Sequence, residues 1–337
     1  MGLIKKTAGA IKVNLVDMLI FELLYRILVF PFFLFLLEQG LKASMRTAGF
    51  SYITAENLAE FLLWPVTAVL FVLMLLAVLC AATVEAGALL TAFEGAAYSR
   101  RVRPGGMLWG GLRKAADELG KRNKRLFFLL GGGALFIQMV PLYLLLSRIK
   151  PVNFVMDELL ALRAGRWGAG IVLLLLAIWL APRAFMPQYS LIEQKAYGDS
   201  RWESFSLFKK KWAQGLALFA GGNLVLAAAM AAAYLLAEFF TAAAVMVLVR
   251  QPLQLAAQSR AFGWVEMALL FVYSILTAIF NVGMFTALYY QNEEREQKRL
   301  PYFVGKGWRD RGRAAALGGV LAAAGAAFLF NLAFNGS

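Results

Sequence analysis

Long runs of apolar residues, separated by shorter polar segments, dominate the chain. A helix needs about 20 such residues to cross a bilayer, and more when it is tilted. On this criterion we predict seven transmembrane helices, at residues 15–38, 60–93, 126–147, 168–192, 213–240, 263–290 and 314–334. Residues 241–262 are apolar only in their first half, so they form either an interfacial helix or a continuation of the fifth span. The pattern predicts an all-α polytopic transmembrane helix bundle, with residues 1–337 forming a single integral membrane domain.

The composition supports a membrane protein. Hydrophobic residues make up 61% of the chain and charged residues 16%, whereas soluble domains have about 45–50% and about 25%. A soluble protein of this length could not bury so many apolar residues in its core, because a large fraction of its residues must lie at the surface. We therefore expect an integral membrane protein.

The distribution of lysine and arginine predicts the orientation. The N-terminus and the loops 98–125, 194–212 and 291–313 hold 24 of these residues, and the alternate loops hold 8. Positively charged loops remain in the cytoplasm, so the N-terminus is predicted inside and, after seven spans, the C-terminus outside. The formal charge of +14 then reflects cytoplasmic loops and their contact with anionic lipids. We expect no nucleic-acid partner, because no nucleic-acid-binding module is present.

Basic segments between the spans have an amphipathic pattern. In a helix formed by loop 98–125, Trp109, Leu112 and Leu119 share one stripe and basic residues surround it. This pattern is typical of a helix lying on an anionic membrane surface, and the segment around Trp212 has the same chemistry. The candidate contacts with anionic lipids are Arg100, Arg101, Arg103, Arg113, Lys114, Lys209, Lys210, Lys211 and Trp212.

A few charged residues fall within the predicted spans. Glu22 and Arg26 are four residues apart, which places them on one helix face where they can pair. Glu85 lies between apolar turns, and Arg183 follows Pro182, where the fourth helix is expected to kink or break. Charged groups inside a membrane are functional candidates by default. Glu22, Arg26, Glu85 and Arg183 therefore form a candidate polar site, either a cavity for a lipid headgroup or ion pairs within the bundle.

The absence of histidine excludes several kinds of chemistry. With no histidine in the chain, a Ser-His-Asp triad, a Cys-His pair and a histidine metal site are all impossible. The single cysteine, Cys80, cannot form an intrachain disulfide. No carboxylate constellation points to a metal, so we expect no cofactor, no metal and no catalytic residue.

Three segments together carry a family resemblance. The first contains Lys12-Val-Asn-Leu, then Leu19-Ile-Phe-Glu-Leu-Leu-Tyr-Arg-Ile-Leu28 and Pro31. The second runs from Glu94 through the basic loop to Arg125, and the third from Pro187 to Trp212. With these segments the chain resembles, over nearly its whole length, the membrane domain of bacterial membrane-bound glycerophosphodiester phosphodiesterases.

The resemblance implies a role in the bacterial cytoplasmic membrane. In this family the catalytic domain is similar to a TIM barrel and carries a His-Arg-Gly signature. Because this sequence has no histidine, none of the catalytic residues can be assigned to it. Either the sequence stops before such a domain or the membrane domain stands alone.

We expect a non-catalytic domain that anchors an extracytoplasmic catalytic domain and presents a lipid or glycerophosphodiester to it. A lipid or small-solute transporter of flippase type is one alternative, and a scaffold for envelope or lipid enzymes is another. A transporter predicts paired broken helices in two halves of the chain.

Overall fold

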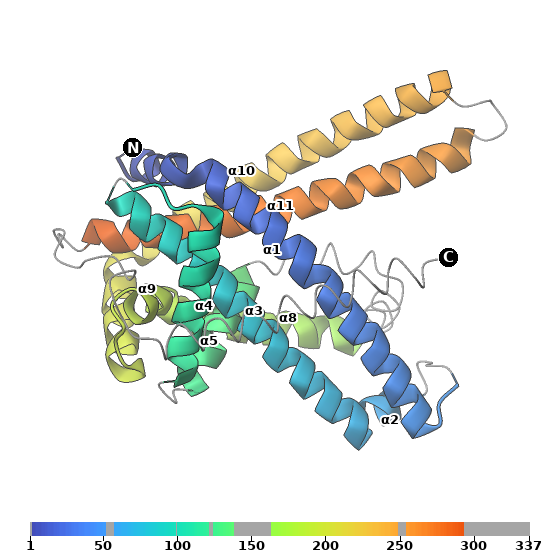
Figure 1. Ribbon diagram of the computed structural model, residues 1–337, viewed down its shortest axis with the longest axis horizontal. Coiled ribbons are helices and arrows are strands. Elements are labelled where there is room, and N and C mark those ends of the chain that lie inside the picture. The colour runs from blue at the N-terminus through green and yellow to red at the C-terminus, as the bar shows by residue number, and fades with distance from the viewer. Residues whose placement is uncertain are drawn as a thin grey trace.

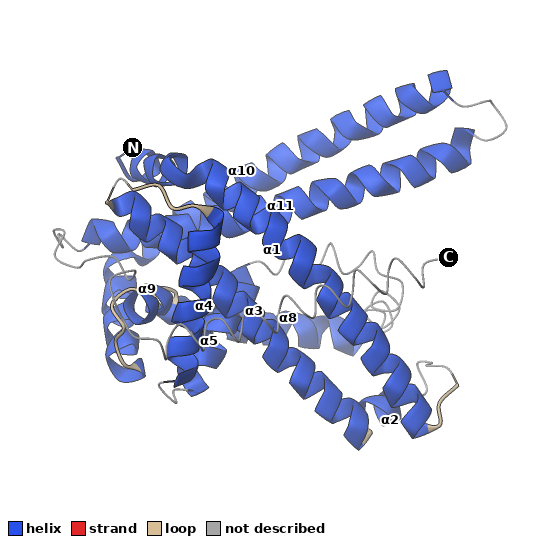
Figure 2. Cartoon of the chain, viewed as in Figure 1, coloured by secondary structure: helices blue, strands red, loops and turns tan. Residues whose placement is uncertain are grey.

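The computed structural model describes residues 2–51, 57–98, 100–120, 124–137, 163–248 and 254–292. These residues form helices and connecting turns, with no strand among them (Figure 2). The all-α prediction is therefore confirmed for this part of the chain. The seventh predicted span, 314–334, and the end of the third, 138–147, lie outside the described residues.

The described residues form long helices and a few short ones. They are α1 (Gly2–Ala48), α2 (Leu58–Leu63), α3 (Pro65–Ala97), α4 (Pro104–Gly120), α5 (Lys124–Ile137), α8 (Arg163–Leu180), the 3-10 helix η1 (Ala181–Arg183), α9 (Met186–Leu191), α10 (Tyr197–Leu248) and α11 (Gln254–Asn292).

Four stretches of the described helices are long and apolar enough to cross a membrane. They are Ile11–Ala48, Pro65–Ala97, Tyr197–Leu248 and Ala261–Gln291, and they correspond to the first, second, fifth and sixth predicted spans. The count of seven and the orientation are not confirmed. Helix α10 continues to Leu248, so the first half of segment 241–262 extends the fifth helix.

The fourth predicted span, 168–192, is interrupted and does not form one continuous helix. Helix α8 ends at Leu180, a 3-10 turn covers Ala181–Arg183, and the short helix α9 follows. Pro182 lies within this turn. Its missing N–H and its ring disfavour a continuous α-helix, and the break expected at this proline is present.

The long helices cross one another at a central bundle, from which α10 and α11 extend as a pair (Figure 1). Within this pair Asn223 Nδ2 donates to Asn281 Oδ1 at 2.8 Å, and Asn281 Nδ2 donates back to Asn223 Oδ1 at 3.2 Å. Further along, the rings of Tyr234 and Phe262 meet edge to face, 5.0 Å apart. Polar side chains that bond across helices favour association in a membrane, where the hydrophobic effect does not.

Helices α3 and α4 approach each other through glycines. A Cβ atom on Gly111 would lie 2.4 Å from the carbonyl oxygen of Val84, and one on Gly87 would lie 3.2 Å from the Gly111 Cα. A Cβ at Gly111 would force the backbone to shift, and one at Gly87 would be a tight contact, so small residues set the separation of the two helices. The adjoining core contains Ala88, Leu112 and other buried apolar residues of α1, α3, α4 and α11.

Candidate functional site

A buried cluster of charges joins α1, α3 and α11. Arg26 Nε donates to Glu22 Oε2 at 2.9 Å, and its Nη2 donates to Glu85 Oε1 at 2.5 Å. Arg26 Nη1 donates to Ser274 Oγ at 2.8 Å, and Ser274 donates onward to the carbonyl oxygen of Phe271. The pairing of Glu22 with Arg26 that their spacing predicts is confirmed, and Glu85 completes the cluster from a second helix.

The cluster is deeply buried, which decides how it is interpreted. Glu22 is 0% exposed and Arg26 7%. A charge in the membrane interior without a partner costs about 2.5–3.5 kcal/mol or more, and here each charge faces an opposite one. The arrangement therefore favours the ion-pair interpretation over a headgroup cavity at these residues, and headgroup binding there stays a prediction. Arg183, the fourth candidate, lies on η1 and is not part of the cluster.

Two of the basic residues predicted to contact lipid are buried inside the protein. Lys114 is 1% exposed and its Nζ lies 2.9 Å from Glu94 Oε2 of α3; Arg113 is 7% exposed. The amphipathic pattern predicts a helix here correctly, but it places these two side chains at a surface. The glycine contacts bring α4 so close to α3 that its basic side is covered, and Glu94 neutralises Lys114.

The exposed basic residues before α4 remain candidates for lipid contact. Arg100, Arg101 and Arg103 are exposed. Arg101 Nε donates to Asp17 Oδ2 at 2.6 Å, and this hydrogen bond raises the pKa of Arg101. The loop is also held by Asn14, which accepts a hydrogen bond from the backbone N–H of Val102 at 2.9 Å.

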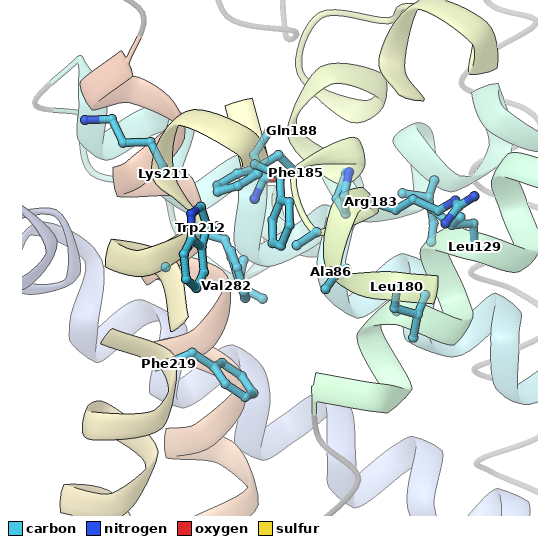
Figure 3. Close-up of a pocket in the computed structure, with 18 of the residues that line it drawn as sticks. Ala86, Leu129, Leu180, Arg183, Phe185, Gln188, Lys211, Trp212, Phe219 and Val282 are labelled. Atoms are coloured by element: carbon cyan, nitrogen blue, oxygen red, sulfur yellow. The ribbon is translucent and has the colours of Figure 1, made fainter. Parts of the chain in front are cut away.

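A second region contains an apolar cavity, which we call the tail pocket (Figure 3). Its volume is about 380 Å³, which falls in the range of about 300–1,000 Å³ that is usual for ligand sites. Side chains from α3, α5, α8, α9, α10 and α11 line it. The apolar part of the lining includes Leu90, Leu129, Leu180, Phe185, Leu216, Phe219, Val282 and Phe285.

Three residues of the sequence-predicted sites meet at this pocket. Arg183, Lys211 and Trp212 all line it, and Figure 3 shows Arg183 and Lys211 on opposite sides of the lining. The Arg183 guanidinium lies over the Trp179 ring, 4.3 Å from its centroid, and donates to the Trp179 carbonyl oxygen. The lining thus combines apolar side chains with two basic residues and an indole. Lys209 and Lys210, the neighbouring candidates on α10, are exposed.

Gln188, an uncharged polar residue in the wall of the tail pocket, was not among the residues selected from the sequence. Gln188 is 2% exposed, and its Nε2 donates to Thr286 Oγ1 at 3.4 Å. The Thr286 hydroxyl donates its own proton to the carbonyl oxygen of Val282 at 2.7 Å, so it can only accept from Gln188. This fixes the amide orientation and leaves Gln188 Oε1 buried without a partner in the described structure. An amide inside the apolar stretch 184–192 was the signal available in the sequence.

A polar network lies after the C-terminal end of α9, beside the pocket. Lys195 Nζ lies 2.8 Å from Glu193 Oε2 and also pairs with Glu203. Tyr289 of α11 donates its hydroxyl proton to Glu193. Burial lowers the pKa of Lys195, but the hydrogen bonds to the two carboxylates outweigh burial and raise the pKa above its ordinary value.

The long apolar helices, the polar contacts buried between them and the lateral apolar pocket define a helical integral membrane protein. Residues 4–313 match the family described as the membrane domain of glycerophosphoryl diester phosphodiesterase. The chain belongs to this family, which confirms the resemblance seen in the sequence. No curated protein and no solved structure matches the chain.

Proposed function

We propose that this chain is a non-catalytic membrane domain that binds a glycerophospholipid or a related phosphodiester and supplies it to a phosphodiesterase domain. The family match supports the connection with phosphodiesterases. The anchoring of an extracytoplasmic catalytic domain in the bacterial cytoplasmic membrane belongs to the same proposal.

The tail pocket is the observation that carries this proposal. It is concave and almost wholly apolar, and its edge carries Arg183, Lys211 and Trp212. An acyl chain gains free energy in such an interior, and a phosphate is attracted to the cations beside it. Trp212 is 54% exposed and has the amphipathic ring that is common at the level of lipid headgroups.

The pocket's position also supports a second candidate function, the transfer of lipid across the membrane. The pocket is lined in part by residues of segment 194–212, which the positive-inside rule predicts on the cytoplasmic face. The catalytic domain was expected on the opposite face. If both predictions hold, the lipid must cross the bilayer to reach that domain, as in the transporter alternative.

Photo-crosslinking tests the lipid pocket directly. The chain is reconstituted in nanodiscs with a phosphatidylglycerol that carries a photoreactive acyl chain, and labelled peptides are mapped. We expect labels on α9 and α10, and a severalfold decrease in the Gly215→Leu variant, because Gly215 lines the pocket. Gly221→Leu is the matched control, since Gly221 lies on the same helix with open space around it. Equal labelling of the two variants would contradict the proposal.

Flux in proteoliposomes separates supply on one face from transfer between faces. Fluorescent phosphatidylglycerol in the inner leaflet is followed by quenching from outside. If the protein transfers lipid, the inner pool should become quenched, and the Gly215→Leu variant should slow this quenching. If the protein only binds lipid, quenching should be the same with and without protein, while photo-crosslinking still occurs.

A further inference from the structure

A second cavity adjoins the tail pocket on the other side of η1. It has a volume of about 590 Å³ and is lined by Pro182, Arg183, Tyr197, Gly198, Arg201, Trp202 and Phe205. Pro182 and Arg183 come from the break after α8, and the remaining residues come from the first turns of α10. We call this cavity the arginine pocket. Arg183 lines both cavities, so one side chain forms part of the wall between them.

The arginine pocket holds two guanidinium groups that have no carboxylate partner among the described residues. Arg183 Nε is buried and makes no hydrogen bond among the described residues. The guanidinium donates from Nη1 to the Trp179 carbonyl oxygen. Arg201 is exposed at the cavity. A guanidinium presents paired N–H donors that match two oxygens of a phosphate.

Two acidic residues of α10, Asp199 and Glu203, lie two positions from Arg201 in the sequence. Glu203 pairs with Lys195, so its carboxylate does not neutralise Arg201. Asp199, in the first turn of the helix, is exposed and is not among the residues that line the cavity. The local charge at the arginine pocket is therefore positive, and its natural occupant is an anion.

Aromatic side chains complete the arginine pocket. Trp202 is 73% exposed, and Tyr197 and Phe205 lie in the same lining. Aromatic rings with one polar edge concentrate at the headgroup level of a bilayer. A site that combines such rings with two arginines, next to an apolar cavity, fits the polar end of a lipid better than it fits a free inorganic anion.

We propose that Arg183 and Arg201 bind the phosphate of a glycerophospholipid whose acyl chain occupies the tail pocket. This inference rests on the proposed lipid-binding function and deepens it, because it assigns the headgroup to a particular cavity. The phosphodiester of the lipid lies at η1, where the break at Pro182 brings α8, α9 and α10 together. The broken fourth helix is then the element that connects headgroup and chain.

The test compares three ligands in competition with the photoreactive phosphatidylglycerol. These are unlabelled phosphatidylglycerol, its deacylated form glycerophosphoglycerol, and diacylglycerol, which has the chains but no phosphate. We expect phosphatidylglycerol to compete best. The double variant Arg183→Gln/Arg201→Gln should lower the affinity for phosphatidylglycerol by about tenfold for each arginine, since losing a hydrogen bond to a charged group has roughly that effect. Diacylglycerol competition should not change.

Control variants make the result specific. Arg125→Gln removes an exposed positive charge of α5 that lines neither cavity, and should leave phosphatidylglycerol competition unchanged. Arg201→Lys keeps the charge but loses the paired donors, so it should recover only part of the affinity. Arg183→Lys replaces the double variant if that variant does not fold.

The outcomes separate the headgroup site from the proposed function. If Gly215→Leu lowers labelling but the arginine variants leave phosphatidylglycerol affinity unchanged, the headgroup assignment is wrong and the tail pocket stands. If glycerophosphoglycerol competes as well as the lipid and Gly215→Leu has no effect, the arginines bind a soluble phosphodiester and the tail pocket fails. An equal loss with Arg125→Gln means general attraction to anionic lipid, and overturns the headgroup site.

Discussion

Two regions of this protein differ in how their charged side chains are paired. In the charge-paired region, formed by α1, α3, α4 and α11, buried charges meet opposite charges: Arg26 lies between Glu22 and Glu85, and Lys114 meets Glu94. In the pocket region, formed by η1, α9 and the start of α10, the arginines of the cavity walls have no carboxylate partner in the described structure. Charge in the first region is paired inside the protein, while the arginines of the second can pair with a ligand.

The two regions also differ in packing. Helices α3 and α4 approach until glycines are required, whereas the pocket region surrounds about 380 Å³ and about 590 Å³ of cavity. Interiors of proteins are normally close-packed and their buried polar groups are bonded. Departures from both rules in the same place indicate a binding site, because a ligand can supply the missing contacts. The charged residues inside a membrane protein are therefore better sorted by whether they are paired than by how deeply they lie.

The largest effect is expected from removing the central cation of the charge-paired region. Arg26→Ala leaves Glu22 and Glu85 buried next to each other, and breaking a buried ion pair costs about 3–5 kcal/mol. We expect a large loss of thermal stability and of monodisperse protein in detergent. The triple variant Glu22→Gln, Arg26→Met, Glu85→Gln, which removes all charge, should recover most of the loss. If Arg26→Ala were as stable as the wild type, the charge cluster would not be stabilising the fold.

The next largest effect is expected at the contact between α3 and α4. In Gly111→Ala the new Cβ would lie 2.4 Å from the Val84 carbonyl oxygen, so the helices must separate, and overpacking of this kind costs about 1–3 kcal/mol. Gly105→Ala, on the same helix with open space around it, is the control and should be neutral or slightly stabilising. Thermal unfolding measures both variants, and equal midpoints would contradict the close approach.

These two regions also show what the sequence can predict. The pairing of Glu22 with Arg26 was predictable because helix geometry alone brings residues four apart together. The choice of Glu85 as the second partner depends on how α3 rotates against α1, which no local pattern specifies. The burial of Lys114 was missed for a related reason, because an amphipathic pattern identifies an apolar face but does not show which neighbour covers the other one.

Only single residues of the pocket region were predicted from the sequence. Arg183 and Lys211 were selected for their charge, and Pro182 was expected to interrupt the helix, but the cavity appears only when distant helices meet. Arg201 and Gln188 were missed, since one resembles any other surface cation in sequence and the other is a single amide among apolar residues. Elements and local pairs thus follow from the sequence, while cavities depend on tertiary packing.

Substitutions at Gln188, in the wall of the tail pocket, and at its partner Thr286 should differ in their effect on stability. Gln188→Leu removes an amide whose Oε1 has no partner among the described residues, and should stabilise the ligand-free protein by about 1 kcal/mol at most or leave it unchanged. Thr286→Val removes the acceptor of Gln188 Nε2 and should destabilise by about 1 kcal/mol. Thermal unfolding in lipid-free detergent compares the two. Destabilisation by both variants would mean that Gln188 is fully bonded, as in the charge-paired region.

The smallest effect is expected from the pH dependence of Lys195, which lies between α9 and α10 in the pocket region. Its pKa is raised by hydrogen bonds to Glu193 and Glu203, although burial opposes the rise. The stabilisation is therefore fully present below the unfolded pKa of about 10.4 and is lost as the pH rises through the higher folded pKa. Wild type should be more stable than Lys195→Met near neutral pH, and the difference should vanish in strong alkali, while Lys210→Met should show no such pH-dependent difference. A constant difference between wild type and Lys195→Met would mean that Lys195 acts through its packing on the Tyr189 ring, 5.3 Å away, and not through its charge.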